Sequence, residues 1–103
     1  MRRVFVVNSG IHDMSAAEQY GQLEPLTEGY IDPARLDRIV AEIRNKLRTS
    51  SAEDYILLSG PGIIQVAAAA YMLLRHGIVN TIRWIQGKYV TKTIRAEWLK
   101  NGG

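Results

Sequence analysis

The chain has 103 residues, which gives room for one domain, residues 1–103, with a modest core. Its composition, 47% hydrophobic and 22% charged, excludes a disordered chain, and the absence of cysteine excludes disulfides and thiolate metal sites. No apolar run is long enough for a signal peptide or a membrane span, so we expect a reducing, cytoplasmic setting.

Residues 4–7 form the first predicted strand. Their continuous β-branched and aromatic run is typical of a strand that is covered on both faces. Residues 9–32 show neither helical nor strand periodicity and contain three glycines and Pro25. We interpret them as one long loop with a short helical turn near residues 15–20. Loops of this length are usually functional or mobile, so this one would serve either as a lid over the sheet edge or as an arm that reaches a neighbouring subunit.

Two helices and a second strand follow. Asp32 and Pro33 predict a helix start, because aspartate caps free N–H groups and proline fits the first turn. The apolar stripe of this helix consists of Leu36, Ile39, Val40, Ile43 and Leu47. Residues 55–58 predict a second buried strand. Residues 62–76 predict a helix that is apolar around most of its circumference, so it must pack on two sides, either within the fold or against a second subunit. Gly77 is the expected left-handed C-cap.

Residues 78–85 and 89–94 predict a third strand and an antiparallel fourth, joined by a tight turn, and residues 95–103 predict a frayed helical turn. The order β-α-β-α-β-β indicates a small Rossmann-like α/β sandwich of three layers. Right-handed crossovers make the first three strands parallel. If the helices cover opposite faces, the strand order is 2-1-3-4. The first strand then lies at the centre, where ligands bind beyond the carboxyl ends.

The loop after the first strand supplies the first candidate site. Asn8, Ser9, His12 and Asp13 provide donors, acceptors and one group that titrates near neutrality, and Gly10 permits a turn. A histidine beside an aspartate fits general acid–base chemistry, which makes His12 the candidate catalytic residue. A polar loop that satisfies its own backbone, with His12 in solvent, explains the same residues.

The second candidate site is the turn Ser59-Gly60-Pro61-Gly62, which leads into a helix. Free N–H groups and the helix dipole favour an anion there, and Gly60 and Gly62 allow a close approach to the backbone. No lysine follows the glycines, so this is not a P-loop. Ser59 as an ordinary N-cap accounts for the turn equally. Since both candidate loops follow parallel strands, we expect them to meet at one rim of the sheet.

The C-terminal hairpin is the third candidate. It interleaves basic and aromatic residues, namely Arg83, Trp84, Lys88, Tyr89, Lys92 and Arg95. Residues 1–54 carry a net charge of −2 and residues 55–103 carry +5. Such a surface would bind nucleic acid by stacking bases on the rings and pairing phosphates with the cations. The other interpretation, which we favour, is an edge hairpin protected from aggregation by its lysines, with Trp84 in the core.

The segments VFVVNSGIHD, LEPLTEGYID and YILLSGPGIIQVAAAAYMLLRHGIVN resemble small uncharacterised proteins of tailed phages and prophages. The resemblance covers nearly the whole chain. It implies a protein made in the cytoplasm of a bacterial host, and it brings no activity with it.

These observations favour binding of a small anionic ligand, a nucleotide or a nucleotide-derived molecule, between the two loops. Asn8, Ser9 and His12 would contact polar groups, and the backbone of Gly60 and Gly62 would hold phosphate. If a reaction follows, hydrolysis or phosphodiester transfer assisted by His12 fits these residues. The alternative is a non-enzymatic phage interaction protein that binds a host protein or nucleic acid through the hairpin.

No cofactor is expected, and no metal site, because the two histidines, His12 and His76, should lie on opposite sides of the domain. We expect a homodimer formed through the apolar helix at residues 62–76.

Overall fold

Two short apolar runs form the centre of the sheet. The computed structural model describes residues 1–10 and 12–100, and in it β1 (Arg3–Val6) and β3 (Tyr55–Leu57) pair in parallel, with Phe5 opposite Ile56. Both faces of these strands are buried, which explains why their apolar residues run consecutively instead of alternating. The two predicted buried strands are therefore confirmed.

The interpretation of residues 9–32 as one long loop is wrong. This segment contains the 3₁₀ helix η1 (Ser15–Tyr20) and a further strand, β2 (Gln22–Pro25), which pairs in parallel with the outer side of β1. β2 has a weak sequence signal because it is an edge strand of four residues with one large apolar side chain, Leu23, and a proline at its end. The segment packs on its own sheet through the buried Ala17 and is not a detached lid.

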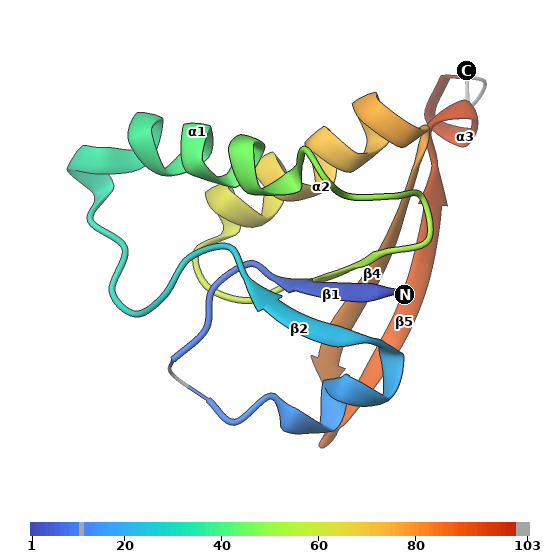
Figure 1. Cartoon of the computed structure of the whole chain (residues 1–103), viewed down its shortest axis with the longest axis horizontal. Helices are drawn as coiled ribbons and strands as arrows, with labels where there is room; N and C mark the ends of the chain where they lie inside the picture. Colours follow the sequence, from blue (N-terminus) through green and yellow to red (C-terminus); the bar gives the residue numbers. More distant parts are fainter. Residues whose placement is uncertain (11, 101–103) are drawn as a thin grey trace.

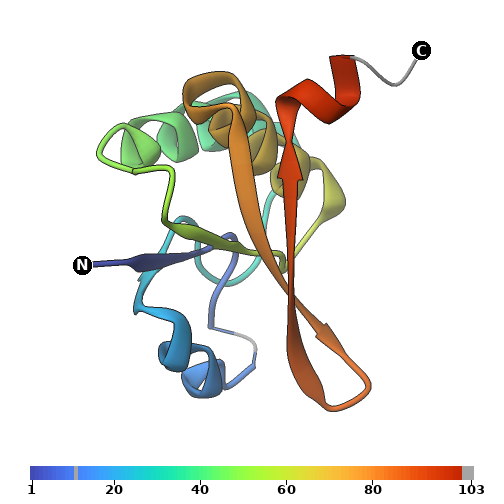
Figure 2. The same ribbon diagram turned by 90° about the vertical axis from the view of Figure 1, so that its right-hand side faces the viewer.

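The two main helices lie on the same face of the sheet, not on opposite faces as expected (Figures 1 and 2). They are α1 (Leu36–Leu47) and α2 (Gly62–His76), and they pack against each other. The five strands take the order β2-β1-β3-β4-β5, so the second predicted strand lies between the first and the third, and four strands are parallel.

The reason for this order is the handedness of the crossovers. The connections through α1 and α2 step across the sheet in one direction, so right-handed crossovers place both helices on one face. The connection from β1 to β2 steps in the opposite direction and therefore runs across the other face, where η1 lies below the sheet in Figure 1. The predicted order failed because it lacked β2.

The ends of the helices follow the expected chemistry. The Asp32 carboxylate accepts a hydrogen bond from Ala34 N at 2.9 Å and caps a short 3₁₀ turn, Pro33–Arg35, that leads into α1. α2 ends at Gly77, whose φ of +73° is the left-handed conformation that favours glycine.

The C-terminal strands form the predicted hairpin. β4 (Ile78–Ile85) and β5 (Lys88–Arg95) are antiparallel, and the two residues between them, Gln86 and Gly87, both have positive φ, as in a type I′ turn. A short helix, α3 (Ala96–Lys100), follows. The predicted end of that turn, residues 101–103, and position 11 of the first loop lie outside the described residues.

Two apolar clusters hold the sheet from its two faces. The larger lies under the helices and includes Phe5, Val7, Ile43, Leu47, Ile56, Ile64 and Met72. The smaller lies on the other face, under η1, and consists of Val4, Val6, Ala17, Leu57 and Ile82. Within residues 1–10 and 12–100, no helix is both long and apolar enough to cross a membrane.

Candidate functional site

The loops after β1 and β3 meet at the carboxyl rim of the sheet, as the sequence predicted. Asn8 N donates a hydrogen bond to Ser59 Oγ at 2.9 Å, and Ser59 Oγ donates to the Asn8 carbonyl at 2.7 Å. The serine side chain thereby continues the pairing of the two strands beyond their last ladder residues. Because its hydroxyl is engaged in both directions, Ser59 positions the loops.

Asn8 has an equally structural environment. Its side chain is buried, its amide nitrogen donates to the Gly29 carbonyl at 3.0 Å, and its amide oxygen accepts from Thr27 Oγ1 at 2.9 Å. The backbone of Ser9 is also paired, since its N–H donates to Thr27 O and its carbonyl accepts from Gly29 N. Asn8 and Ser9 therefore tie the first loop to the chain that follows β2.

Gly60 sits where only glycine fits. Its φ is +75°, and a Cβ added there would lie 2.6 Å from the Cβ of Asn8. Gln65 Nε2 donates to the Gly60 carbonyl at 2.7 Å and holds this conformation from the first turn of α2. By contrast, Gly62 begins α2 in open space, and Gly10 makes the expected turn with a φ of +93°.

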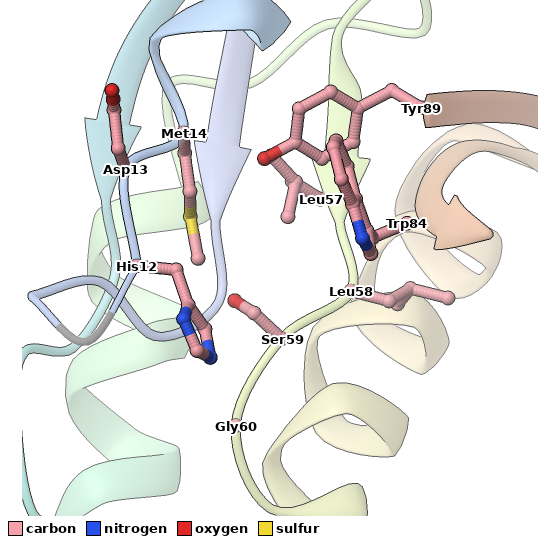
Figure 3. Close-up of a pocket in the computed structure, with 9 residues that line it drawn as sticks. All are labelled: His12, Asp13, Met14, Leu57, Leu58, Ser59, Gly60, Trp84 and Tyr89. Carbon is pink, nitrogen blue, oxygen red and sulfur yellow. The ribbon is translucent and has the colours of Figure 1, made fainter. Parts of the chain in front are cut away.

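A pocket of about 340 Å³ lies beside this rim, and Figure 3 shows the residues that line it. Three segments contribute to its lining: the loop after β1, the end of β3 with its following turn, and the hairpin. The lining residues are His12, Asp13, Met14, Leu57, Leu58, Ser59, Gly60, Trp84 and Tyr89. The volume and the largely apolar lining, with a few polar groups at one end, are typical of small-molecule sites.

One wall of the pocket is aromatic. Trp84 and Tyr89 face each other across the hairpin, with ring centroids 4.8 Å apart and an interplanar angle of 72°. Trp84 is 60% exposed, so the expectation that it lies in the core is wrong. In Figure 3 the two rings face His12 and Met14 across the gap.

Sequence reasoning missed Trp84, Met14, Leu57 and Leu58 as lining residues. For Trp84 a signal was present. A two-residue turn at Gln86 and Gly87 fixes the register of the hairpin, and that register pairs Trp84 with Tyr89 on one face.

Two titratable groups near the pocket are perturbed. The hydrogen bond from Ser15 N to the Asp13 carboxylate, 2.9 Å long, holds the pKa of Asp13 below its ordinary value, and the Ser15 side chain adds to this effect. Burial raises the pKa of Tyr89, and the negative charge of Asp13 raises it further. At neutral pH the pocket therefore presents a neutral phenol and an ionised carboxylate.

The two histidines lie far apart, as expected. His12 is exposed and lines the pocket, whereas His76 lies at the opposite end of α2, where its Nε2 is 2.9 Å from Ser50 Oγ. Across the part of the chain that the structure describes, no group of three His, Cys, Asp or Glu side chains could hold a metal ion.

The basic residues of the hairpin are divided between the two faces of the sheet. Lys88 and Lys92 lie four residues apart in β5 and so point to one face of the sheet, whereas Tyr89 points to the other. Arg83 pairs with Val90 and therefore lies on the same face as the two lysines. Tyr89 shares the other face with Arg95, which lies at the far end of the strand opposite Ile78. Arg83, Lys88 and Lys92 therefore lie on the face opposite the two aromatic rings.

The fold and the pocket define a small α/β protein with a candidate ligand site at the rim of its parallel strands. Residues 2–96 match the model of the family described as Phage Pam3 gp32-like protein, and because the match spans nearly the whole chain, the protein belongs to that family. The resemblance to phage proteins is confirmed. No curated protein and no solved structure matches the chain.

Proposed function

We propose that this protein binds a nucleotide, or a nucleotide-derived molecule with a single phosphate, in the pocket between the loop after β1, the turn after β3 and the hairpin. The observation that carries the proposal is the pairing, in one pocket, of an exposed tryptophan with a glycine turn at the start of a helix. The ring and the turn match the two ends of a nucleotide.

The position of the pocket supports ligand binding. The strand order resembles that of doubly wound, Rossmann-like sheets, and the chain leaves β1 toward one face and β3 toward the other. In such sheets ligands bind outside the carboxyl ends of the strands at this reversal. The pocket lies at that point, since it is lined by Leu58, Ser59 and Gly60, the three residues that follow β3.

The aromatic wall suits the base. A nucleobase stacked on an aromatic side chain gains about 1–3 kcal/mol, whatever the base. Tyr89 contacts Trp84 edge to face and so fixes the orientation of the indole. Leu57 and Met14 supply apolar contacts around the same space.

The opposite end of the pocket suits one phosphate. α2 has 15 residues and no side-chain N-cap, and Gly60 lines the pocket two residues before the helix begins, so the backbone N–H groups of Gly60 and Gly62 would hold the anion near the positive end of the helix. His12 adds a ring N–H that can donate a hydrogen bond to a phosphate oxygen. The lining residues include no lysine or arginine and do include Asp13, which favours a monophosphate over a triphosphate.

Tryptophan fluorescence tests the proposal directly. In a Trp98→Phe background Trp84 is the only tryptophan, so titration with AMP, GMP, CMP and UMP reports on the pocket. We expect quenching of Trp84 by at least one monophosphate and, in a melting assay, stabilisation of about 2.7 kcal/mol at 100 times its dissociation constant. Trp84→Ala, measured by calorimetry, should weaken binding by about 5- to 150-fold, the equivalent of one stacked base.

The matched control is Arg83→Ala, because Arg83 neighbours Trp84 in sequence but lies on the other face of β4. It should leave nucleotide affinity unchanged. No quenching and no thermal shift with any of the four nucleotides would refute the proposal. Steeply salt-dependent binding of a single-stranded oligonucleotide that survives His12→Ala but is lost in Lys88→Ala and Lys92→Ala would support the nucleic-acid alternative instead.

A further inference from the structure

An apolar face runs along α2 and continues onto α3. Ile63, Val66, Leu74 and Leu99 are each more than half exposed, although they are large apolar side chains. Such side chains rarely gather on one surface of a monomer without a partner.

The spacing of these residues places them together. Positions 63, 66, 70 and 74 of a helix fall on one side, and that side is opposite the buried Ile64, Ala68 and Met72. Leu74 and Leu99 line one shallow groove together with Ala70, Leu73, Ala96 and, at its end, Lys100. The exposed stripe of α2 and the apolar side of α3 therefore form a single surface, which we call the α2–α3 face.

The charge pattern of this face limits what covers it. Residues 62–74 carry no charged side chain, so a nucleic acid or an acidic peptide finds no complementary charge along the stripe. A second copy of the same uncharged stripe satisfies this condition, because a two-fold interface pairs each patch with itself.

The distribution of side-chain size also fits a second copy. Ile63 and Val66 lie at one end of the stripe and Leu74 at the other, and the alanines at 67 and 70 lie between Val66 and Leu74. In an antiparallel pair of α2 helices the alanines meet near the two-fold axis, which lets the backbones approach closely, and each Ile63 meets the partner helix's last turn.

We propose that the α2–α3 face binds a second copy of this chain through antiparallel packing of α2 on α2. The four large exposed side chains present on the order of 500 Å² of apolar surface, which approaches the roughly 800 Å² that each partner buries in a standard interface. The alanines and the residues around the groove supply the remainder. This proposal is independent of ligand binding in the pocket.

Light scattering after size-exclusion chromatography across the micromolar range tests the proposal. The wild-type chain should have twice the monomer mass, and Val66→Glu should halve it. The control is Val40→Glu, which introduces the same change at an exposed valine of α1 and should leave the dimer intact. Circular dichroism checks that both variants remain folded, as expected for exposed positions.

A cross-linking experiment tests the geometry. The chain has no cysteine, so Ala70→Cys provides one thiol per subunit, and it should form an intersubunit disulfide on oxidation. Ala34→Cys, an exposed position before α1, should not. A monomeric wild type, or a Val66→Glu variant that stays dimeric, would overturn the proposal. Failure of Ala70→Cys to cross-link would overturn the antiparallel arrangement.

Discussion

Replacing Gly60 by alanine tests the close approach between the two loops of the site. The added Cβ would lie 2.6 Å from the Cβ of Asn8, and Asn8 cannot move freely because its amide is held at both ends. A left-handed backbone costs a non-glycine residue about 1–2 kcal/mol. An overpacked contact adds about 1–3 kcal/mol. We therefore expect Gly60→Ala to lower the free energy of unfolding by about 2–5 kcal/mol.

Two other glycines separate these contributions. Gly77 has nearly the same φ as Gly60, +73° against +75°, but no atom lies within 4 Å of its added Cβ. Gly77→Ala should therefore cost only the backbone penalty of about 1–2 kcal/mol. Gly62 has neither a positive φ nor a neighbour, so Gly62→Ala should be neutral or stabilise the protein by up to about 1 kcal/mol.

Urea denaturation followed by circular dichroism, with all variants at one protein concentration and fitted with a shared slope, gives the three differences. Thermal melts provide a second measure, at about 4–8 °C for each kcal/mol in a domain of this size. The difference between Gly60→Ala and Gly77→Ala isolates the contact with Asn8. If the two variants lose the same stability, the close approach of the two loops does not exist and the structural argument for the rim fails.

Three further predictions concern the residues around the pocket and the sheet. Asn8→Ala and Thr27→Ala should each cost about 1–3 kcal/mol, and a double-mutant cycle should show a coupling of at least about 0.5 kcal/mol, because Thr27 Oγ1 donates a hydrogen bond to the Asn8 side-chain oxygen at 2.9 Å; strictly additive losses would contradict this. In an ultraviolet titration compared with Tyr89→Phe, Tyr89 should ionise above its ordinary pKa, and Asp13→Asn should lower that pKa only partly, because burial is the larger cause. The pKa of Tyr89 is raised in the folded protein, so Tyr89 stabilises the fold fully at any pH below its pKa in the unfolded chain. This stabilisation is lost as the pH rises through its pKa in the folded protein. A melting temperature that increases between these two pKa values would disprove the raised pKa. Asp54→Ala should cost about 2–4 kcal/mol in chemical denaturation, because its buried carboxylate accepts hydrogen bonds from two backbone N–H groups at 2.8 and 2.9 Å; a loss below 1 kcal/mol would rule this out.

The sequence predicted the elements whose signal is local. β1 and β3 are continuous apolar runs, α2 is bounded by Pro61 and Gly77, and the hairpin is defined by its two-residue turn. Each of these signals lies within the element itself, so no knowledge of its neighbours was needed. β2 could not be found in this way. Its pairing with β1 depends on backbone hydrogen bonds along one side, and its side chains carry little apolar pattern.

The candidate site was predictable only in part, for a related reason. Chain connectivity alone placed the loops at Asn8 and Ser59 on one rim, because both follow parallel strands. That placement survived the wrong strand order, since β1 and β3 are neighbours in either arrangement. The role of Trp84 was not predictable from composition, because an indole on a strand fits a core as well as a pocket. Trp84 is exposed because β3 pairs with β4 only as far as Ile82, two residues before the tryptophan.

The strands differ in length, and the difference shapes the pocket. β3 pairs with β4 only as far as Ile82, whereas β4 continues to Ile85. Beyond Ile82 the hairpin is a two-stranded ribbon that extends past the parallel sheet, as Figure 2 shows, and Trp84 is carried on this overhang. One side of the cleft is thus anchored by the rim contacts of Asn8 and Ser59, while the other is supported by a single neighbouring strand. Bending of the ribbon would change the width of the cleft and leave the anchored rim in place.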